Sequence, residues 1–393
     1  MGKASSFPSV LLYLILATFI VYECSLMFAG VDDMGEQVSA FGTVSTFPII
    51  LLLLSVIYLG MQKSRWKDPV YRSYLVVFIS TYALTVFWAL FYPLSSRIVL
   101  FSSFLPLCFW LIGYNLSEQK CQETIKYYIP VCFIALILYF YISFDPTLML
   151  NKEYAAINAS YIIIYLLPFV LLSENRIVRI GAIVLAAVVT MYSLKRGGMV
   201  SLSIGVLFYL IAFGKMTSGK LFSFRGVLVL AVMLVAIYYL VMYYNDTMDG
   251  LVFNRFMTIE QDGGSGRDGI YKTVQKMISN SSFLSYIFGH GWDAVARDSS
   301  SGLSAHNDFL EFIYDFGYIV LFCYIVFIFK LLNRFVRMLK ANHKYAPAFA
   351  ASIGIFLTNS FVSHIYIYSW YMLVFTLFWG FILRDTRTIT VRK

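Results

Sequence analysis

The sequence contains few charged residues and few cysteines. Only 13% of its 393 residues are charged, whereas 60% are hydrophobic and the mean hydropathy is +0.75. The charges fall in clusters between long apolar runs, a pattern that a soluble domain of this size does not need. We therefore expect lipid to surround most of the chain, which excludes an ordinary soluble enzyme.

The five cysteines do not suggest a disulfide framework or a cysteine-based metal site, because four lie in apolar runs and Cys121 lies in a loop expected inside the cell. The D-x-D and Walker motifs, which bind metal diphosphates and nucleotides, are absent, as are H-E-x-x-H and G-x-S-x-G. We therefore expect arginines rather than a metal to bind any phosphate, and we expect no cofactor.

Twelve apolar runs are long enough, or nearly long enough, to cross a bilayer. No small-residue cleavage site follows the first run, so we expect an uncleaved first helix. The runs cover approximately residues 8–29, 44–62, 70–92, 97–116, 127–144, 157–173, 178–194, 198–213, 226–243, 309–329, 348–366 and 368–383.

Positive charges predict the orientation of these runs. With a cytoplasmic N-terminus, most of the 30 Lys and Arg residues lie inside, as the positive-inside rule requires. This placement also explains the net charge of +9, so we expect no nucleic-acid partner. The inside residues are Lys3, Lys63, Arg65, Lys67, Arg72, Lys120, Lys126, Arg176, Arg179, Lys215, Lys220, Arg225, Lys330, Arg334, Arg337, Lys340, Lys344, Arg384, Arg387, Arg392 and Lys393.

The sequence therefore predicts an all-α polytopic membrane protein with about twelve transmembrane helices and both termini in the cytoplasm. We expect residues 1–393 to form a single membrane domain. One long periplasmic loop, residues 244–308, would carry short helices between helices 9 and 10. This loop is too short for an independent domain of ordinary size, so we expect it to pack on the outer face of the bundle.

Two cations break the orientation rule in the short turn Lys195-Arg196-Gly197-Gly198. The paired glycines let the backbone turn tightly and leave room for a ligand, and a guanidinium can hold a phosphate in a bidentate manner. The alternative is an arginine that extends to the membrane boundary. We interpret Arg196 as a catalytic phosphate ligand and Lys195 as a substrate-binding residue.

A glycine-rich stretch in the long loop ends at Arg267. Hydrophobic residues follow at helical spacing, which predicts a helix that begins near Arg267. Such a helix start can bind an anion, so Arg267 is a second candidate catalytic residue. The alternative is a solvated loop arginine or a partner of Asp268. The spaced hydrophobic residues are Ile270, Val274, Met277 and Ile278.

His306 stands just before the run that begins near residue 309, at the expected outer surface. A neutral imidazole there can accept a proton from an incoming hydroxyl, so His306 is the third catalytic candidate. Asn307 or Asp308 is expected to cap the following helix, and Asp308 or Glu311 to orient the ring. We include these three residues among the substrate-binding candidates; the alternative is a histidine that only caps or packs.

Weaker candidates lie elsewhere on the expected outer side. His290 stands between two glycines, and Trp292 after it could stack on a sugar ring, although a structural role is the simpler reading. Arg97 opens the fourth run, and we include it with these two as substrate-binding candidates. Glu23 and His364 lie toward the outer ends of their runs, where each could line a polar cavity or form a buried pair.

These motifs together resemble the bacterial O-antigen polymerase and O-antigen ligase superfamily. His306-Asn307 is followed by nine residues and then Gly317, as in the ligase motif. The turn at 195–198 is similar to the Arg-Gly turn of this superfamily, and Gly266-Arg267 is similar to its loop arginine. Val320 stands where that motif usually has a smaller or polar residue, which favours a polymerase.

The resemblance implies an inverting, metal-independent glycosyl transfer on the periplasmic face of the bacterial inner membrane. Arg196 and Arg267 would hold the diphosphate, and His306 would activate the acceptor hydroxyl. Donor and acceptor would be undecaprenyl-diphosphate-linked oligosaccharides, with a chain-length regulator and a flippase as partners. Three hypotheses stay open: a repeat-unit polymerase, which we favour; a ligase that transfers the glycan to the lipid A core; and a flippase or transporter for the same lipid-linked sugar.

Overall fold

The computed structural model describes most of the predicted apolar runs. The run 226–243 lies almost entirely outside the described residues, and the candidate Arg97 lies outside them too. The described residues are 6–27, 30–31, 37–39, 42–43, 46–62, 68–92, 103–116, 118–123, 129–143, 159–193, 195–217, 267–300 and 302–386, with a few isolated positions.

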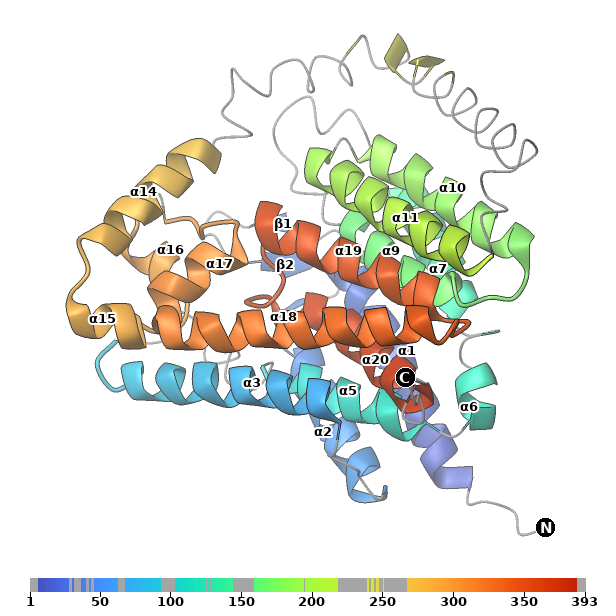
Figure 1. The fold of residues 1–393 in the computed structure, drawn as a ribbon, viewed down its shortest axis with the longest axis horizontal. Helices are drawn as coiled ribbons and strands as arrows, with labels where there is room; N and C mark the ends of the chain where they lie inside the picture. Colours follow the sequence, from blue (N-terminus) through green and yellow to red (C-terminus); the bar gives the residue numbers. More distant parts are fainter. Residues whose placement is uncertain are drawn as a thin grey trace.

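Helices form nearly all of this described chain (Figure 1). A small antiparallel sheet, β1 (Gly30–Val31), β2 (Gln37–Ser39) and β3 (Gly42–Thr43), follows the first helix and was not predicted from the sequence. The helices are α1 (Ser6–Met27), α2 (Thr46–Gly60), α3 (Pro69–Trp88), α5 (Leu105–Asn115), α6 (Glu118–Glu123), α7 (Ile129–Ser143), α9 (Ala159–Val170), α10 (Arg176–Tyr192), α11 (Arg196–Met216), α14 (Arg267–Ser279), α15 (Phe283–Phe288), α16 (Ala294–Asp298), α17 (Asp308–Glu311), the π-helix η4 (Phe312–Phe316), α18 (Gly317–Lys340), α19 (Ala346–Val362) and α20 (Ser369–Asp385).

Several of these helices have the length and composition of membrane spans. Three described segments are long and apolar enough to cross a bilayer: Pro69–Trp88, Arg196–Met216 and Asp308–Lys340. The shorter apolar helices are Phe7–Tyr22, Thr46–Gly60, Leu105–Asn115, Ser160–Val170 and Ala346–Val362. The described chain therefore agrees with the predicted all-α membrane class.

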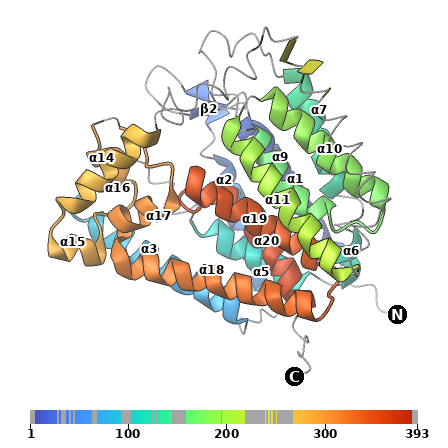
Figure 2. The ribbon, with the colours of Figure 1, turned by 45° about the horizontal axis from the view of Figure 1, so that its top comes forward.

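Close backbone contact joins the helices in the middle of the bundle. A Cβ atom added at Gly380 of α20 would lie 2.2 Å from the carbonyl oxygen of Trp110 in α5. One added at Gly113 of α5 would lie 2.3 Å from the carbonyl oxygen of Leu377. Glycines permit this approach, which lets helices in lipid gain van der Waals contact. Helices α11 and α19 also lie side by side (Figure 2).

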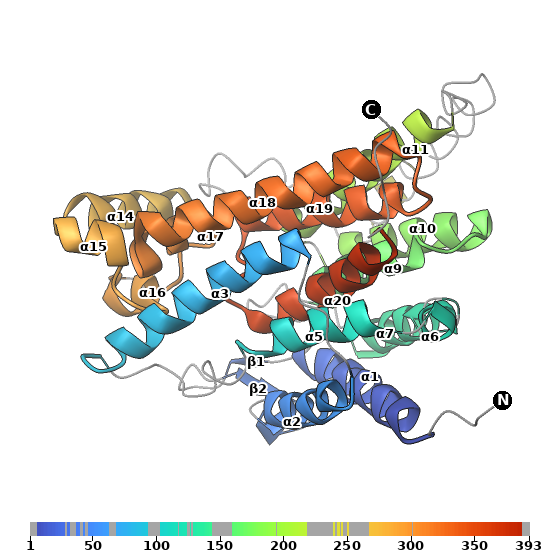
Figure 3. The ribbon, with the colours of Figure 1, turned by 60° about the horizontal axis from the view of Figure 1, so that its bottom comes forward.

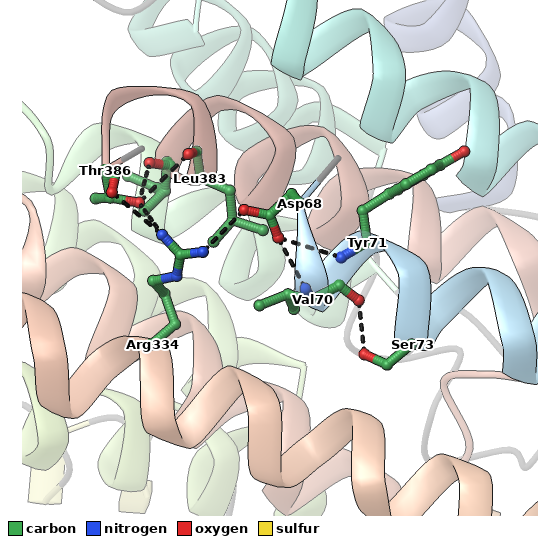
Figure 4. Close-up of polar contacts among 8 residues, drawn as sticks. Asp68, Val70, Tyr71, Ser73, Arg334, Leu383 and Thr386 are labelled. Carbon is green, nitrogen blue, oxygen red and sulfur yellow. Dashed lines mark hydrogen bonds and ion pairs between the residues drawn. The ribbon is translucent and has the colours of Figure 1, made fainter. Parts of the chain in front are cut away.

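Asp68 and Arg334 join three helices at one end of the bundle (Figure 4). Asp68 caps α3, because its Oδ1 accepts hydrogen bonds from the backbone N–H groups of Val70 at 2.8 Å and Tyr71 at 3.3 Å. Arg334 of α18 donates through Nη2 to Asp68 Oδ2 at 2.8 Å and through Nη1 to the carbonyl oxygen of Thr386, at the end of α20, at 3.1 Å. The joined segments are among those that the positive-inside rule places in the cytoplasm.

Replacing Arg334 by alanine should lower the free energy of unfolding by about 3 kcal/mol, because the Asp68 carboxylate would remain buried without its cation. Denaturant unfolding of the detergent-solubilised protein, followed by tryptophan fluorescence, measures this change. Arg337→Ala, at an exposed position of the same helix, is the matched control and should change stability by less than about 0.5 kcal/mol. Equal effects of the two substitutions would contradict the role of the ion pair.

The short helices α14, α15 and α16 gather at the opposite end of α18 (Figure 3). Helix α18 begins beside them at Gly317 and reaches Arg334 roughly 25 Å further along its axis. This separation is close to the thickness of the hydrocarbon core of a bilayer, about 30 Å. The short helices and the Asp68–Arg334 ion pair therefore lie at opposite ends of the apolar bundle.

Candidate functional site

Two histidines from distant segments stack on one another beside α17. The rings of His306 and His364 have centroids 4.8 Å apart and planes 20° apart. His364 lies in the loop between α19 and α20, is 8% exposed, and has its Nδ1 3.3 Å from Ser304 Oγ. The sequence predicted that His364 either lines a polar cavity or belongs to a buried pair. The structure places it against His306, the candidate base.

His306 adopts a backbone conformation that is unusual for its residue type. Its φ is 51°, in the left-handed region that costs free energy for residues other than glycine. Neighbouring bonds hold this conformation: the Tyr271 hydroxyl donates to the His306 carbonyl oxygen at 3.3 Å, and Asn307 Nδ2 donates to the Phe361 carbonyl oxygen at 3.0 Å. The position of the imidazole is therefore set by α14 and α19 as well as by its own loop.

Asn307 caps α17, as the sequence predicted for Asn307 or Asp308. Its Oδ1 accepts hydrogen bonds from the backbone N–H groups of Phe309 at 2.9 Å and Leu310 at 3.1 Å. An asparagine at this position satisfies N–H groups that have no partner within the helix. The cap fixes the start of the helix directly after His306.

Asp308 and Glu311 hold the backbone around the two histidines. The Asp308 carboxylate, which is fully buried, accepts hydrogen bonds from the N–H groups of Ile365 at 3.0 Å and Tyr366 at 3.3 Å. Glu311 accepts a hydrogen bond from the N–H of Ala305. We expected one of these carboxylates to orient the His306 ring; both instead bind main-chain groups, because buried N–H groups require acceptors.

Asp315 has a similar role that the sequence analysis missed. Its carboxylate oxygens accept hydrogen bonds from the N–H groups of Asp293 and Val295, each at 3.0 Å. Its carbonyl oxygen accepts hydrogen bonds from the N–H groups of His290 at 3.1 Å and Gly291 at 2.8 Å. The spacing of Asp315 from Asp308 and Glu311 is the only sequence signal that places it near them.

Arg267 begins α14, so the predicted helix start is confirmed. Val274 is buried and Ile270, Met277 and Ile278 pack around it, against a cluster that contains Ala294, Val295 and Ala305. This packing holds α14 on the segment that carries His306. Arg267 consequently interacts electrostatically with both His306 and His364.

Lys195 is the second cation of this cluster. It directly precedes α11, and its Nζ lies 5.7 Å from the centre of the Tyr161 ring. It also interacts electrostatically with both histidines. The structure therefore brings Lys195, Arg267 and His306 together. Arg196 is the first residue of α11, next to Lys195, and its phosphate-binding role stays a prediction.

The pKa of His306 is lowered to about 4, first by burial and then by the positive charges of Arg267 and Lys195. Burial disfavours the charged imidazolium, and each cation disfavours a further positive charge beside it. The imidazole is therefore neutral at neutral pH and can accept a proton. The two cations next to it suit an anionic ligand.

His290 and Trp292 lie in a separate aromatic cluster. The His290 ring stacks on Tyr314 with centroids 4.4 Å apart, and its Nε2 lies 3.1 Å from Ser281 Oγ. Trp292 packs against Phe316 with centroids 5.5 Å apart. These contacts explain both residues as packing elements between the short helices α15 and α16 and the π-helix η4, and a role in sugar binding stays a prediction.

The arrangement around His306 fits a proton transfer next to a negatively charged group. A neutral imidazole can take a proton from a hydroxyl, and Lys195 and Arg267 can stabilise an anion as it forms. In the described part of the chain, no group of three or more His, Cys, Asp or Glu side chains could hold a metal ion.

Comparison with protein families agrees with this chemistry. Residues 181–325 match the family described as O-Antigen ligase. The match confirms the resemblance to the O-antigen polymerase and ligase superfamily. Members of this superfamily are membrane enzymes of the glycosyltransferase type, and the matched segment contains Lys195, Arg196, Arg267 and His306. The comparison with curated proteins finds no match.

Tyr161 and Tyr271 lie next to the candidate site but were not predicted. Tyr271 follows Arg267 by one helical turn and donates to the His306 carbonyl oxygen, so helical spacing could have identified it. Tyr161 lies in an apolar run before the matched segment. Nothing in its local sequence distinguishes it from a core residue.

Proposed function

We propose that the protein is a membrane glycosyltransferase that polymerises polyprenyl-diphosphate-linked oligosaccharide repeat units of an O-antigen, capsule or similar polysaccharide. The observation that carries the proposal is the partly buried His306 imidazole, which stacks on His364 and has a pKa that is lowered by burial and by the positive charges of Arg267 and Lys195. A base next to two cations suits a reaction in which a hydroxyl loses a proton while a diphosphate leaves. The family match supports the same class of reaction.

In the proposed reaction, the acceptor hydroxyl oxygen attacks the anomeric carbon of the donor sugar. The bond between this carbon and the diphosphate oxygen breaks, and the diphosphate leaves with the electron pair. His306 takes the proton of the attacking hydroxyl, and Arg267, Lys195 and Arg196 offset the charge that develops on the leaving group. A single displacement of this kind inverts the anomeric configuration.

The proposed topology has twelve spans, both termini in the cytoplasm and residues 244–308 in the periplasm, all within one membrane domain of the bacterial inner membrane. Two observations support this orientation. The basic segments joined by Asp68 and Arg334 lie at one end of α18, and α14 lies with His306 at the other. A nucleotide-sugar donor is cytoplasmic, whereas a lipid-linked glycan can present its diphosphate on the outer face.

The acceptor separates a polymerase from a ligase. Val320, which departs from the ligase motif, is buried on the first turns of α18 and favours the polymerase. Analysis of lipid-linked and core-linked glycans in a deletion strain tests this choice. Loss of long chains while a single unit still reaches the lipid A core is the expected result; loss of every unit from the core would identify a ligase.

A flippase or transporter for the same lipid-linked sugar is the third candidate. It requires a site that is reachable from both sides of the membrane, whereas α14, which begins at Arg267 and packs on the segment that carries His306, lies at one end of the bundle (Figure 1). An Arg196→Ala strain should still export single units but lose chain length. Loss of export in that strain would favour transport. A flippase and a chain-length regulator are proposed as separate partners of the enzyme.

The rate of transfer should stay high well below the usual pKa of histidine. The base must be neutral, and because the pKa of His306 is lowered to about 4, kcat/KM should fall only as the pH approaches 4. Lys195→Ala removes one cation, so the acid limb of its kcat/KM profile should move to higher pH. Radiolabelled transfer assays across the pH range measure both profiles. Ionisation of the substrate affects both proteins in the same way, so it does not cause a difference between the two profiles. An acid limb near pH 6.5 in the unmodified enzyme would contradict this role of His306.

A further inference from the structure

The loop between α19 and α20, residues 363–368, lies against the segment that carries His306. Its residue His364 stacks on the His306 ring, with centroids 4.8 Å apart and planes 20° apart. The backbone N–H of the next residue, Ile365, donates to Asp308 Oδ1 at 3.0 Å. The 363–368 loop therefore contacts the candidate base directly and is also joined to the first residue of α17, the helix that follows this base.

His364 is itself held firmly. Its side chain is 8% exposed, and its ring centroid lies 4.2 Å from that of Tyr368, at the end of the same loop. Its Nδ1 lies 3.3 Å from Ser304 Oγ, within hydrogen-bond distance. A ring that is enclosed by packing and bound through one nitrogen has little freedom to turn. His364 therefore offers His306 a flat surface at a fixed place.

The His306 ring has no hydrogen bond to orient it. Among the residues that the structure describes, none hydrogen-bonds to a ring nitrogen of His306, and the bond from Tyr271 reaches only its carbonyl oxygen. A catalytic imidazole is usually oriented by a hydrogen bond from one of its nitrogens to a carboxylate or carbonyl oxygen. The nearby carboxylate of Asp308 instead binds main-chain N–H groups.

Stacking can replace such a hydrogen bond. It fixes the plane of the imidazole through its face and leaves both ring nitrogens available to a substrate. The need for support is large at His306, because its φ of 51° is a strained conformation that persists only when the surroundings hold it.

We propose that His364 is a positioning residue for the reaction, and that its ring, fixed by the 363–368 loop, sets the orientation of the His306 imidazole toward the acceptor hydroxyl. This inference rests on the proposed function for the role of His306. It extends the site beyond residues 181–325, the segment that matches the family, to a loop that follows α19.

Substitutions that separate a flat ring from its volume test the stack. His364→Phe keeps a flat ring and should leave kcat within about threefold of the unmodified enzyme, whereas His364→Leu fills a similar volume without a flat face and should lower kcat about 30-fold, because a displaced base loses part of its effect. KM for the lipid-linked donor should change less than about twofold in both variants, since Lys195 and Arg267 remain. Transfer from a radiolabelled donor measures both constants.

His343→Leu is the matched control, because His343 lies at the other end of α18 and contacts Asp385. It should leave kcat and KM unchanged. The melting temperature of every variant is measured beside its rate. If His364→Leu does not fold, His364→Met takes its place, since methionine is flexible and fits irregular spaces.

The orientation of His306 can also be measured without catalysis. The chain has four histidines, so isotope labelling of histidine gives few ring resonances for the full-length protein in nanodiscs, and His306→Gln identifies the signal of His306. An aromatic ring stacked on His306 shifts this signal through its ring current. The shift should remain in His364→Phe and disappear in His364→Leu.

Three results would overturn the inference. Equal kcat values for His364→Leu and His364→Phe would show that no flat ring is needed at this position. A folded His364→Phe protein that is as slow as His364→Leu would assign the effect to the imidazole nitrogens rather than to the stack. A change in KM with kcat unaffected would make His364 a substrate-binding residue.

Failure of this inference can be distinguished from failure of the proposed function. If the ring-current shift of His306 depends on the ring at position 364 but the unmodified protein transfers no glycan, the stack stands and the glycosyltransferase proposal fails. If the protein transfers glycan and the His364 variants keep the full kcat, the function stands and the positioning role of His364 is lost.

Discussion

Replacing His306 by alanine should lower the rate of glycan transfer by about 10²–10⁴-fold, the usual contribution of a positioned general base. The side chain is held next to Lys195 and Arg267 in a neutral state, so its removal takes away the proton acceptor. Diphosphate binding should change little, because the two cations remain. Transfer from a labelled lipid-linked donor, measured beside pyrophosphate binding, checks both parts.

His343→Ala is the control for the loss of a histidine. His343 lies at the opposite end of α18, where its Nε2 is 3.3 Å from Asp385, and its removal should leave the rate of transfer within a few-fold of the unmodified enzyme. If His306→Ala reduced diphosphate binding as much as transfer, His306 would be a structural residue and the general-base role would be lost.

Gly317→Ala should separate the short helix α15 from the start of α18 and lower the free energy of unfolding by at least about 3 kcal/mol. Gly317 has a φ of 79°, and a Cβ atom there would lie 2.2 Å from the carbonyl oxygen of Ile287, at the end of α15. The contact leaves no space for a side chain and the backbone conformation favours glycine. The close approach of α15 therefore explains why the ligase-like motif has a glycine at this position.

Gly302→Ala distinguishes the effect of the contact from the effect of backbone conformation. Gly302 also has a positive φ, 65°, but an added Cβ would meet no atom within 4 Å. Its replacement should cost only about 1–2 kcal/mol, the penalty for a left-handed residue. Denaturant unfolding and limited proteolysis of the segment that contains α14, α15 and α16 compare the two variants. Similar stability of Gly317→Ala and Gly302→Ala would show that the approach of α15 to Gly317 is not required.

Local features of the fold could be predicted from the sequence. The spacing of Ile270, Val274, Met277 and Ile278 predicted α14, and these residues do pack on one side of it. Asn307 was one of two predicted caps, and it caps α17. Such features depend on residues within one or two helical turns.

Contacts between distant segments could not be predicted in the same way. His364 and Tyr161 lie in apolar runs that read as ordinary spans, yet one stacks on His306 and the other lies against the start of α11. One of the carboxylates of Asp308 and Glu311 was expected to orient the imidazole. Both instead accept hydrogen bonds from backbone N–H groups. Which acceptor a buried N–H group finds depends on the packing of whole helices.

Sequence by itself indicated a helical membrane protein that resembles the O-antigen polymerase and ligase superfamily, and it identified Arg267, Lys195 and His306 as candidates. Hydrophobic length, charge and short motifs are properties of the chain that need no knowledge of contacts. Only the tertiary structure decided that Arg267 and Lys195 act electrostatically on His306, that His364 stacks on it and Tyr161 lies under Lys195, and that the buried carboxylates hold the backbone. Small residues at the helix interfaces determine how closely the helices approach one another. Each buried polar group also needs a hydrogen-bond partner, and which partner it finds depends on that packing.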